Sequence, residues 1–122
     1  MQDHQQPLDF SYLIEMVGDD PAFLIDFFET FIKQTPIYLG EMNEALLHSN
    51  WGKVASCAHK IKPTFSYIGR NDVKEFVQTI EHNARNMIFL EKIAIDIHRL
   101  EFLLLQIYEQ LEEAKKENQT RL

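Results

Sequence analysis

Hydrophobic residues recur every three or four positions through most of this chain, which is the spacing of one face of an α-helix. The clearest stripe lies near the C-terminus, where apolar residues alternate four and three apart over three heptads: Ile93, Ile97, Leu100, Leu104, Ile107 and Leu111. It predicts a long helix over about 89–116. No stretch combines two-residue alternation with the turn pairs of a hairpin. The pattern therefore predicts an all-α fold.

Helix-start signals divide the first half of the chain into shorter predicted helices. Asp9 is placed to cap a short helix that Gly18 ends. Asp20-Pro21 begins a second helix, because an acidic cap followed by proline starts a helix without losing a hydrogen bond. Thr35-Pro36 repeats this signal, so we expect a third helix from there to His48. The apolar positions of the second and third helices are expected to face the core, and they are Phe23, Leu24, Phe27, Phe28, Phe31, Ile32, Ile37, Tyr38, Met42, Ala45 and Leu46.

A fourth helix is predicted over 51–67, with Asn50 as its cap and Gly69 placed to end it. Its core-facing stripe consists of Val54, Cys57, Ala58, Ile61, Phe65 and Ile68. His59 and Lys62 then fall on the opposite, solvent-facing side. Because the ring of Pro63 would clash with the His59 carbonyl and has no N–H to donate to it, we expect a local kink or a freed carbonyl there.

A fifth helix is predicted over about 72–86, and its core positions are Val73, Phe76, Val77 and Ile80. Short connections between long helices favour antiparallel neighbours, so the last four helices should form an up-down-up-down four-helix bundle. One or two additional short N-terminal helices would cover one end. A length of 122 residues fits one domain. We expect a bundle over 8–117, a flexible lead-in over 1–7 and a frayed C-terminal tail over 118–122.

Composition and charge exclude several classes of protein. A net charge of −7 argues against nucleic acid as a partner, because phosphate-backbone binding needs clustered Lys and Arg. No apolar run reaches the roughly 18 residues of a membrane span. Cys57 is the only cysteine, and no charged-then-apolar leader opens the sequence. These features predict a reduced, cytoplasmic location without membrane attachment.

Few residues are arranged for chemistry. No Glu stands three residues before a His, as di-metal bundles require, and the sequence lacks a glycine-rich phosphate loop and a recognisable Ser or Cys nucleophile. We therefore predict no metal and no cofactor. His59 is the remaining candidate for a reactive group. A nucleophilic imidazole must be exposed, oriented and close to cations. Lys60 and Lys62 flank it, and the polar stripe of the next helix could face it, with Gln78, Glu81 and Arg85. Without such partners His59 would be an ordinary surface histidine.

The stretch Ala58-His59-Lys60-Ile61-Lys62, with Gly69 ten residues after the histidine, resembles the signature of histidine-containing phosphotransfer (HPt) domains. That signature reads Ala-His-x-Leu-Lys-Gly followed by a later Gly, and the likeness extends over about 8–114. The resemblance implies that His59 is phosphorylated, that Lys62 lies beside the phosphate, and that Glu81 orients the imidazole, with Gln78 one turn earlier. We expect a docking surface that includes Lys60, Pro63, Ser66 and Arg85, with Phe65 or Tyr67 at its edge. Pro63 departs from the family, which usually has glycine there.

The resemblance predicts a phosphorelay intermediate that accepts a phosphoryl group on His59 from a receiver-domain aspartate and passes it to another receiver. Its partners would be response-regulator receiver domains, including that of a hybrid sensor histidine kinase. The Mg²⁺ would belong to the receiver, and the chain would be a monomer without kinase activity of its own. The alternative is a non-catalytic helical interaction module that dimerises through the 93–111 stripe. The phosphoacceptor helix pair of a sensor kinase fits less well, because it predicts two helices and an attached ATP-binding domain.

Overall fold

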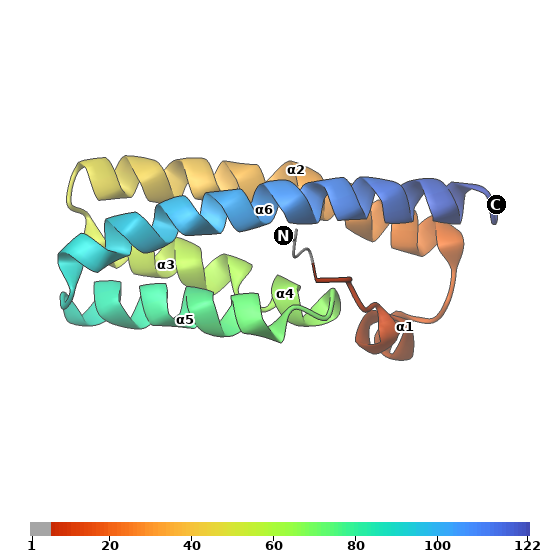
Figure 1. Cartoon of the computed structure of the whole chain (residues 1–122), viewed down its shortest axis with the longest axis horizontal. Coiled ribbons are helices and arrows are strands. Elements are labelled where there is room, and N and C mark those ends of the chain that lie inside the picture. Colours follow the sequence, from red (N-terminus) through yellow and green to blue (C-terminus); the bar gives the residue numbers. More distant parts are fainter. Residues whose placement is uncertain (1–5) are drawn as a thin grey trace.

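The computed structural model describes residues 6–122, which are helical throughout except for short connections (Figure 1). Figure 1 shows the long helices side by side, with consecutive ones pointing in opposite directions. The described residues contain no strand, so the predicted all-α class is confirmed. The elements are α1 (Ser11–Val17), α2 (Pro21–Leu47), α3 (Trp51–Ile61), α4 (Thr64–Tyr67), α5 (Asn71–Asn86) and α6 (Leu90–Gln119).

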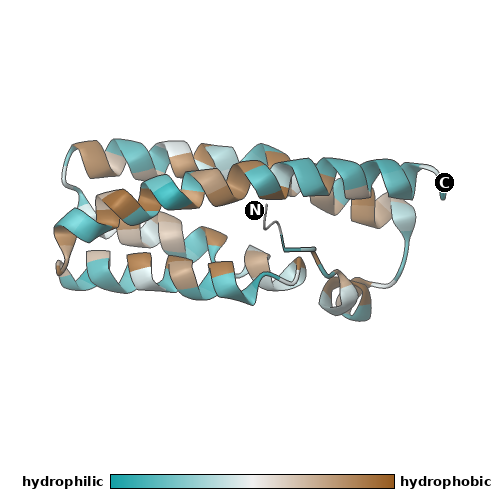
Figure 2. Ribbon diagram, in the orientation of Figure 1, coloured by the Kyte–Doolittle hydropathy of each residue, from teal (hydrophilic) through white to brown (hydrophobic). Residues whose placement is uncertain are grey.

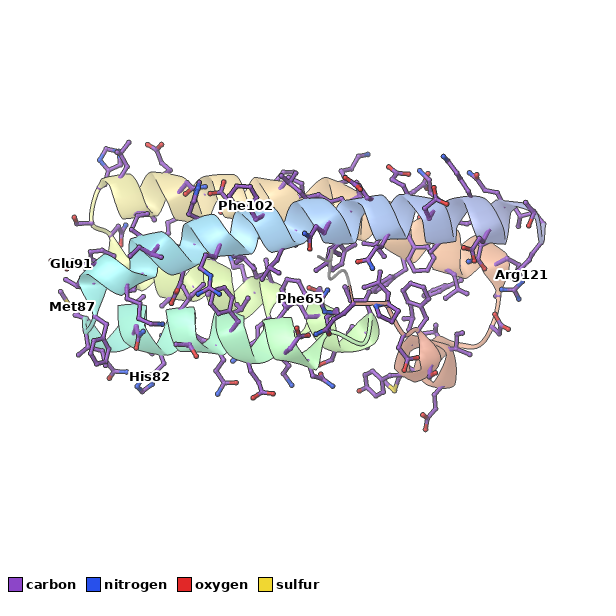
Figure 3. All side chains as sticks on the ribbon, viewed as in Figure 1. Phe65, His82, Met87, Glu91, Phe102 and Arg121 are labelled. Carbon is purple, nitrogen blue, oxygen red and sulfur yellow. The ribbon has the colours of Figure 1, made fainter. Side chains whose placement is uncertain are left out.

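The core is built from the stripes that the sequence predicts. Figure 2 shows hydrophobic and hydrophilic residues alternating along each long helix, as expected for helices with one buried side. The six apolar residues of the α6 stripe are at most 1% exposed, and those of α3 and α4 at most 2%. Phe65 accordingly lies inside the bundle in Figure 3. The coiled-coil-like stripe of α6 is therefore used to close the core.

The predicted helix start at Thr35-Pro36 is wrong. Helix α2 runs unbroken from Pro21 to Leu47, and Thr35 is 3% exposed inside it. Because α2 packs against both α3 and α6, tertiary contacts outweigh the local cost of an internal proline. A continuous helix also keeps the phase set by its first turns, which places Phe23 and Ile37 outside: these predicted core residues are 44% and 52% exposed.

The local irregularity predicted at Pro63 is present as an interruption of the helix. Helix α3 ends at Ile61, and the single turn of α4 begins at Thr64. Lys62 N still donates to the Ala58 carbonyl at 3.1 Å, but Ser66 N donates to the Pro63 carbonyl three residues back, at 3.2 Å. The Thr64 hydroxyl donates to the carbonyl of Ile61, which compensates a carbonyl at the end of α3.

Helix α1 lies at the end of the bundle where α4 turns into α5 (Figure 1). Asp9 N donates to the Ile68 carbonyl at 3.0 Å, and the ring of Tyr12 stacks on that of Tyr67 with centroids 5.4 Å apart. Gly69 has φ +76°, and a Cβ there would lie 2.6 Å from the Cβ of Asp9. This position therefore requires glycine for both its backbone conformation and the close approach of the N-terminal segment.

The end of α6 differs from the frayed tail expected over 118–122. The helix continues to Gln119, Asn118 is 9% exposed, and Arg121 Nη2 lies 2.9 Å from Asp19 Oδ1. At the other terminus, the expected lead-in over 1–7 falls mostly outside the described residues, although the Gln6 carbonyl accepts from Gln110 Nε2 at 2.6 Å. In the described part of the chain, none of the helices has the length and apolarity that crossing a membrane requires.

Candidate functional site

His59 lies in the last turn of α3, directly before the break at Pro63, and its side chain is 64% exposed. Its Nδ1 is 3.0 Å from Oε2 of Glu81, which belongs to α5. Lys62 Nζ donates to Glu81 Oε1 at 2.8 Å, and Arg85 Nη2 donates to Glu81 Oε2 at 3.1 Å. Three basic side chains from two helices therefore meet on one carboxylate.

The helical spacing of both elements explains why these side chains meet. On α3, burial of the Ala58 and Ile61 stripe turns His59 and Lys62 toward the α5 side of the outer surface. On α5, Glu81 and Arg85 are one turn apart on the side that faces α3. Both helices also bury small residues, which are Ala55 and Ala58 on α3 and Ala84 on α5.

Glu81 is the electrostatic centre of the site, with a side chain that is only 12% exposed. Burial is the largest single influence and raises the pKa of Glu81, but hydrogen bonds from Lys62 and Arg85 and the charge of Lys62 outweigh it. Together with the contact from His59 they hold the pKa below its ordinary value of 4.5. The carboxylate is therefore ionised at neutral pH, with its charge compensated by its neighbours.

This charge state determines which nitrogen of the histidine ring donates to Glu81. An ionised carboxylate can only accept hydrogen bonds, so Nδ1 of His59 must carry the proton that it shares with Glu81. In the neutral ring the other nitrogen, Nε2, then has a free lone pair. Because the side chain is largely exposed, His59 combines an oriented ring with an accessible nucleophilic nitrogen.

The structure brings together only part of the predicted site. Gln78 is exposed, and within residues 6–122 it makes no hydrogen bond to His59. Lys60 points toward α2, where its Nζ lies 5.8 Å from the centroid of the Tyr38 ring. Ser66 donates to Asn71 at 3.1 Å instead of contacting the histidine. The four predicted residues that meet are His59, Lys62, Glu81 and Arg85.

The two aromatic residues expected at the edge of a docking surface differ in their exposure. Phe65 is 0% exposed, so the expectation is wrong for this residue: its position belongs to the buried stripe. Tyr67 is half-buried between Tyr12 and Phe27, whose ring centroids lie 5.4 and 6.0 Å from its own. The aromatic side chains of α4 therefore pack α1 and α2 onto the bundle.

Small residues adjoin His59 on the outer surface of α3, and two of them, Gly52 and Ser56, are additional to the predicted site. Gly52, Ser56 and Pro63 are all exposed, and they stand seven and three residues before the histidine and four after it. Helical spacing places these positions on the same side as His59. The imidazole thus has small side chains at these positions, while Lys62, three residues further on, turns onto Glu81. Positions i−7, i−3 and i+4 are readable from sequence, so this feature could have been found.

The family model described as Hpt domain matches residues 26–115. The chain belongs to the Hpt domain family. The predicted family is thus confirmed, and the match includes α3, α5 and most of α2 and α6. No curated protein and no solved structure matches the chain significantly. Hpt domains act in histidine phosphotransfer within phosphorelays, as phosphocarriers that interact with response-regulator receiver domains.

Proposed function

We propose that this protein is a phosphorelay intermediate that accepts a phosphoryl group on Nε2 of His59 from a receiver-domain aspartate and donates it to the aspartate of another receiver. One observation carries this proposal: an exposed imidazole whose Nδ1 is hydrogen-bonded to an ionised, largely buried Glu81. Such a ring is oriented and presents one free lone pair to a partner.

In the proposed transfer, the Nε2 lone pair of His59 attacks the phosphorus of the aspartyl phosphate in line with the leaving oxygen. The N–P bond forms as the P–O bond to the aspartate breaks, and the aspartate leaves as a free carboxylate. The Nδ1 proton remains hydrogen-bonded to Glu81, which stabilises the positive charge that develops on the ring. The reverse sequence of bonds passes the group to the second receiver.

Phosphoryl transfer depends mainly on positioning and charge neutralisation, which this site and its partner would share. We assign the Mg²⁺ and the acidic residues that hold it to the receiver. Lys62 and Arg85 would offset the charge of the phosphoryl group after transfer, because both contact the same carboxylate, Glu81, as the histidine ring. Lys62 is the better shielded of the two, with 19% of its side chain exposed against 59% for Arg85.

Replacing His59 by glutamine tests the proposal. We expect His59→Gln to keep its helical circular dichroism, because the side chain is largely exposed, and to lose all acceptance of label from phosphorylated receivers. His98 on α6 provides the control, because its side chain is 72% exposed and lies on another helix. The variant His98→Gln should accept label as the unmodified protein does. Undiminished labelling of His59→Gln would refute the assignment.

The alternative of a module that dimerises through the 93–111 stripe gains no support, because that stripe is buried in the core of a single chain. Our inference of a monomer is checked by light scattering, which should return the mass of one 14.4 kDa chain. A cytoplasmic location and a hybrid sensor kinase as partner are part of the same proposal. Assays with a panel of phosphorylated receivers would identify the partner.

A further inference from the structure

A small pocket lies between α2 and the break that separates α3 from α4. Its volume is about 90 Å³, equal to roughly three water molecules at ~30 Å³ each or to one short aliphatic side chain. Phe27, Tyr38 and Ile61 supply apolar wall, and the exposed residues Thr30 and Gln34 form the α2 side of its rim. We call this cavity the break pocket.

The break pocket depends on the interruption at Pro63. It is lined by Ile61, the last residue of α3, and by Thr64, the first residue of α4. The hydroxyl of Thr64 donates to the Ile61 carbonyl, so its hydrogen-bonding capacity as a donor is already used. An apolar cavity that stays open to solvent is unfavourable unless something fills it.

The break pocket lies beside the part of α3 that carries His59. Lys60 and Ile61 line it, and they directly follow the histidine in α3. Pro63 is exposed between His59 and α4. Lys60 stands at the opening with its ammonium group 5.8 Å from the Tyr38 ring centroid, close enough for a cation–π contact. A partner interface of ordinary size, about 800 Å² on each protein, would therefore cover both the imidazole and the pocket opening.

The charges of this surface indicate which kind of body covers it. The chain carries a net charge of −7, yet Lys62 and Arg85 meet beside His59, and Lys60 lines the neighbouring pocket. The one carboxylate among them, Glu81, is already compensated by its three contacts. The surface is thus locally basic on an acidic protein, which complements an acidic partner site such as one that holds an aspartyl phosphate.

We propose that the break pocket receives an apolar side chain of the receiver domain that exchanges phosphoryl groups with His59. This inference rests on the proposed function. The inserted side chain would act as an anchor that fixes the receiver on the histidine surface, while the basic residues meet the acidic rim of its phosphoryl site. A buried apolar anchor surrounded by polar contacts is the usual arrangement of an interface hot spot.

The test fills the break pocket from its exposed rim without touching His59. The variants Thr30→Trp and Gln34→Trp each place an indole at the opening. If one of them fails to fold, the other still tests whether a filled pocket weakens transfer. The control is Lys33→Trp, because Lys33 is adjacent in sequence but lines a different groove with Glu29 and Glu112, beside α6. Two donors are compared: a phosphorylated receiver, and phosphoramidate, which transfers its phosphoryl group to the imidazole with loss of ammonia.

We expect the receiver concentration for half-maximal transfer to rise at least tenfold in the pocket variants and to stay unchanged in Lys33→Trp. Labelling by phosphoramidate should be the same in all of them, since this donor needs no docking surface.

Equal receiver transfer in the pocket variants and the control would overturn the inference while leaving the proposed function intact. Loss of phosphoramidate labelling in the pocket variants would also overturn it, because the effect would then lie at the histidine itself. Failure of the unmodified protein with both donors would instead refute the proposed function.

Discussion

The α3–α5 pair and the α2–α6 pair are both joined by polar side-chain contacts, but the two contacts are built differently. Between α3 and α5, three basic groups converge on Glu81, whose side chain is 12% exposed. Between α2 and α6, Asn43 Nδ2 donates to Glu101 Oε2 at 3.3 Å, and Glu101 is 42% exposed. Shielding from water makes the first contact electrostatically strong, while the second resembles an ordinary surface contact.

The outer surfaces of these pairs also differ in the size of their side chains. Helix α6 exposes Ile95, Phe102 and Leu105 by about 60% each. Helix α3 instead exposes Gly52 and small neighbours around the histidine. In this molecule the proposed phosphoacceptor therefore lies where side chains are small and one charge is partly buried. Large exposed apolar residues alone do not locate it.

Truncating an isoleucine on each pair should give the largest difference. Ile61→Ala removes a side chain that is 2% exposed, and we expect a loss of about 2–5 kcal/mol in the free energy of unfolding. Ile95→Ala removes one that is 60% exposed and should change stability by less than about 0.5 kcal/mol. Urea titrations measure both. Equal losses would mean that α3 is rotated differently about its axis.

The α3–α5 site could be predicted from sequence because it depends on local spacing. The stripe ending in Ile61 and Phe65 determines where His59 points, and the polar stripe of the next helix places Glu81 opposite it. The effect of Pro63 could also be predicted, because a proline within a helix cannot donate to the carbonyl four residues before it, which here is that of His59.

The α2 side could not be predicted in the same way. Thr35-Pro36 has the local signature of a helix start, and only the packing of α2 between α3 and α6 makes the helix continue. The direction of Lys60 toward Tyr38 and the break pocket depend equally on α2, so no pattern within α3 reveals them.

The next largest effect should come from neutralising one carboxylate in each pair. Glu81→Gln keeps the shape of the side chain but loses charge-assisted hydrogen bonds, so we expect a loss of about 1–2 kcal/mol at pH 7. Glu101→Gln should stay within about 0.5 kcal/mol, because that contact is exposed. Denaturant titrations would compare them. A cost for Glu101→Gln equal to that for Glu81→Gln would remove the distinction between the two pairs.

The cost of Glu81→Gln should also depend on pH. Folding lowers the pKa of Glu81, so the unfolded state binds a proton more readily than the folded state. The stabilisation is therefore fully present above the ordinary value of 4.5 and is lost as the pH falls through the lower, folded value. The stability difference between the protein and Glu81→Gln should shrink as the pH falls below 4.5. A difference that stays constant down to pH 3 would contradict the assigned ion network.

The smallest expected difference in stability is between replacing Pro36 in α2 and replacing Pro63 after α3. Pro36 lies inside the unbroken α2, where its missing N–H and its ring both weaken the helix, so Pro36→Ala should raise the free energy of unfolding by about 1 kcal/mol. Pro63 stands where α3 has already ended, and Pro63→Ala should change stability by less than about 0.5 kcal/mol. The restored N–H at position 63 could extend α3 by bonding to the His59 carbonyl. If Pro63→Ala gained as much stability as Pro36→Ala, the break would be a strained interruption that costs folding energy, and the break pocket would exist at the expense of stability.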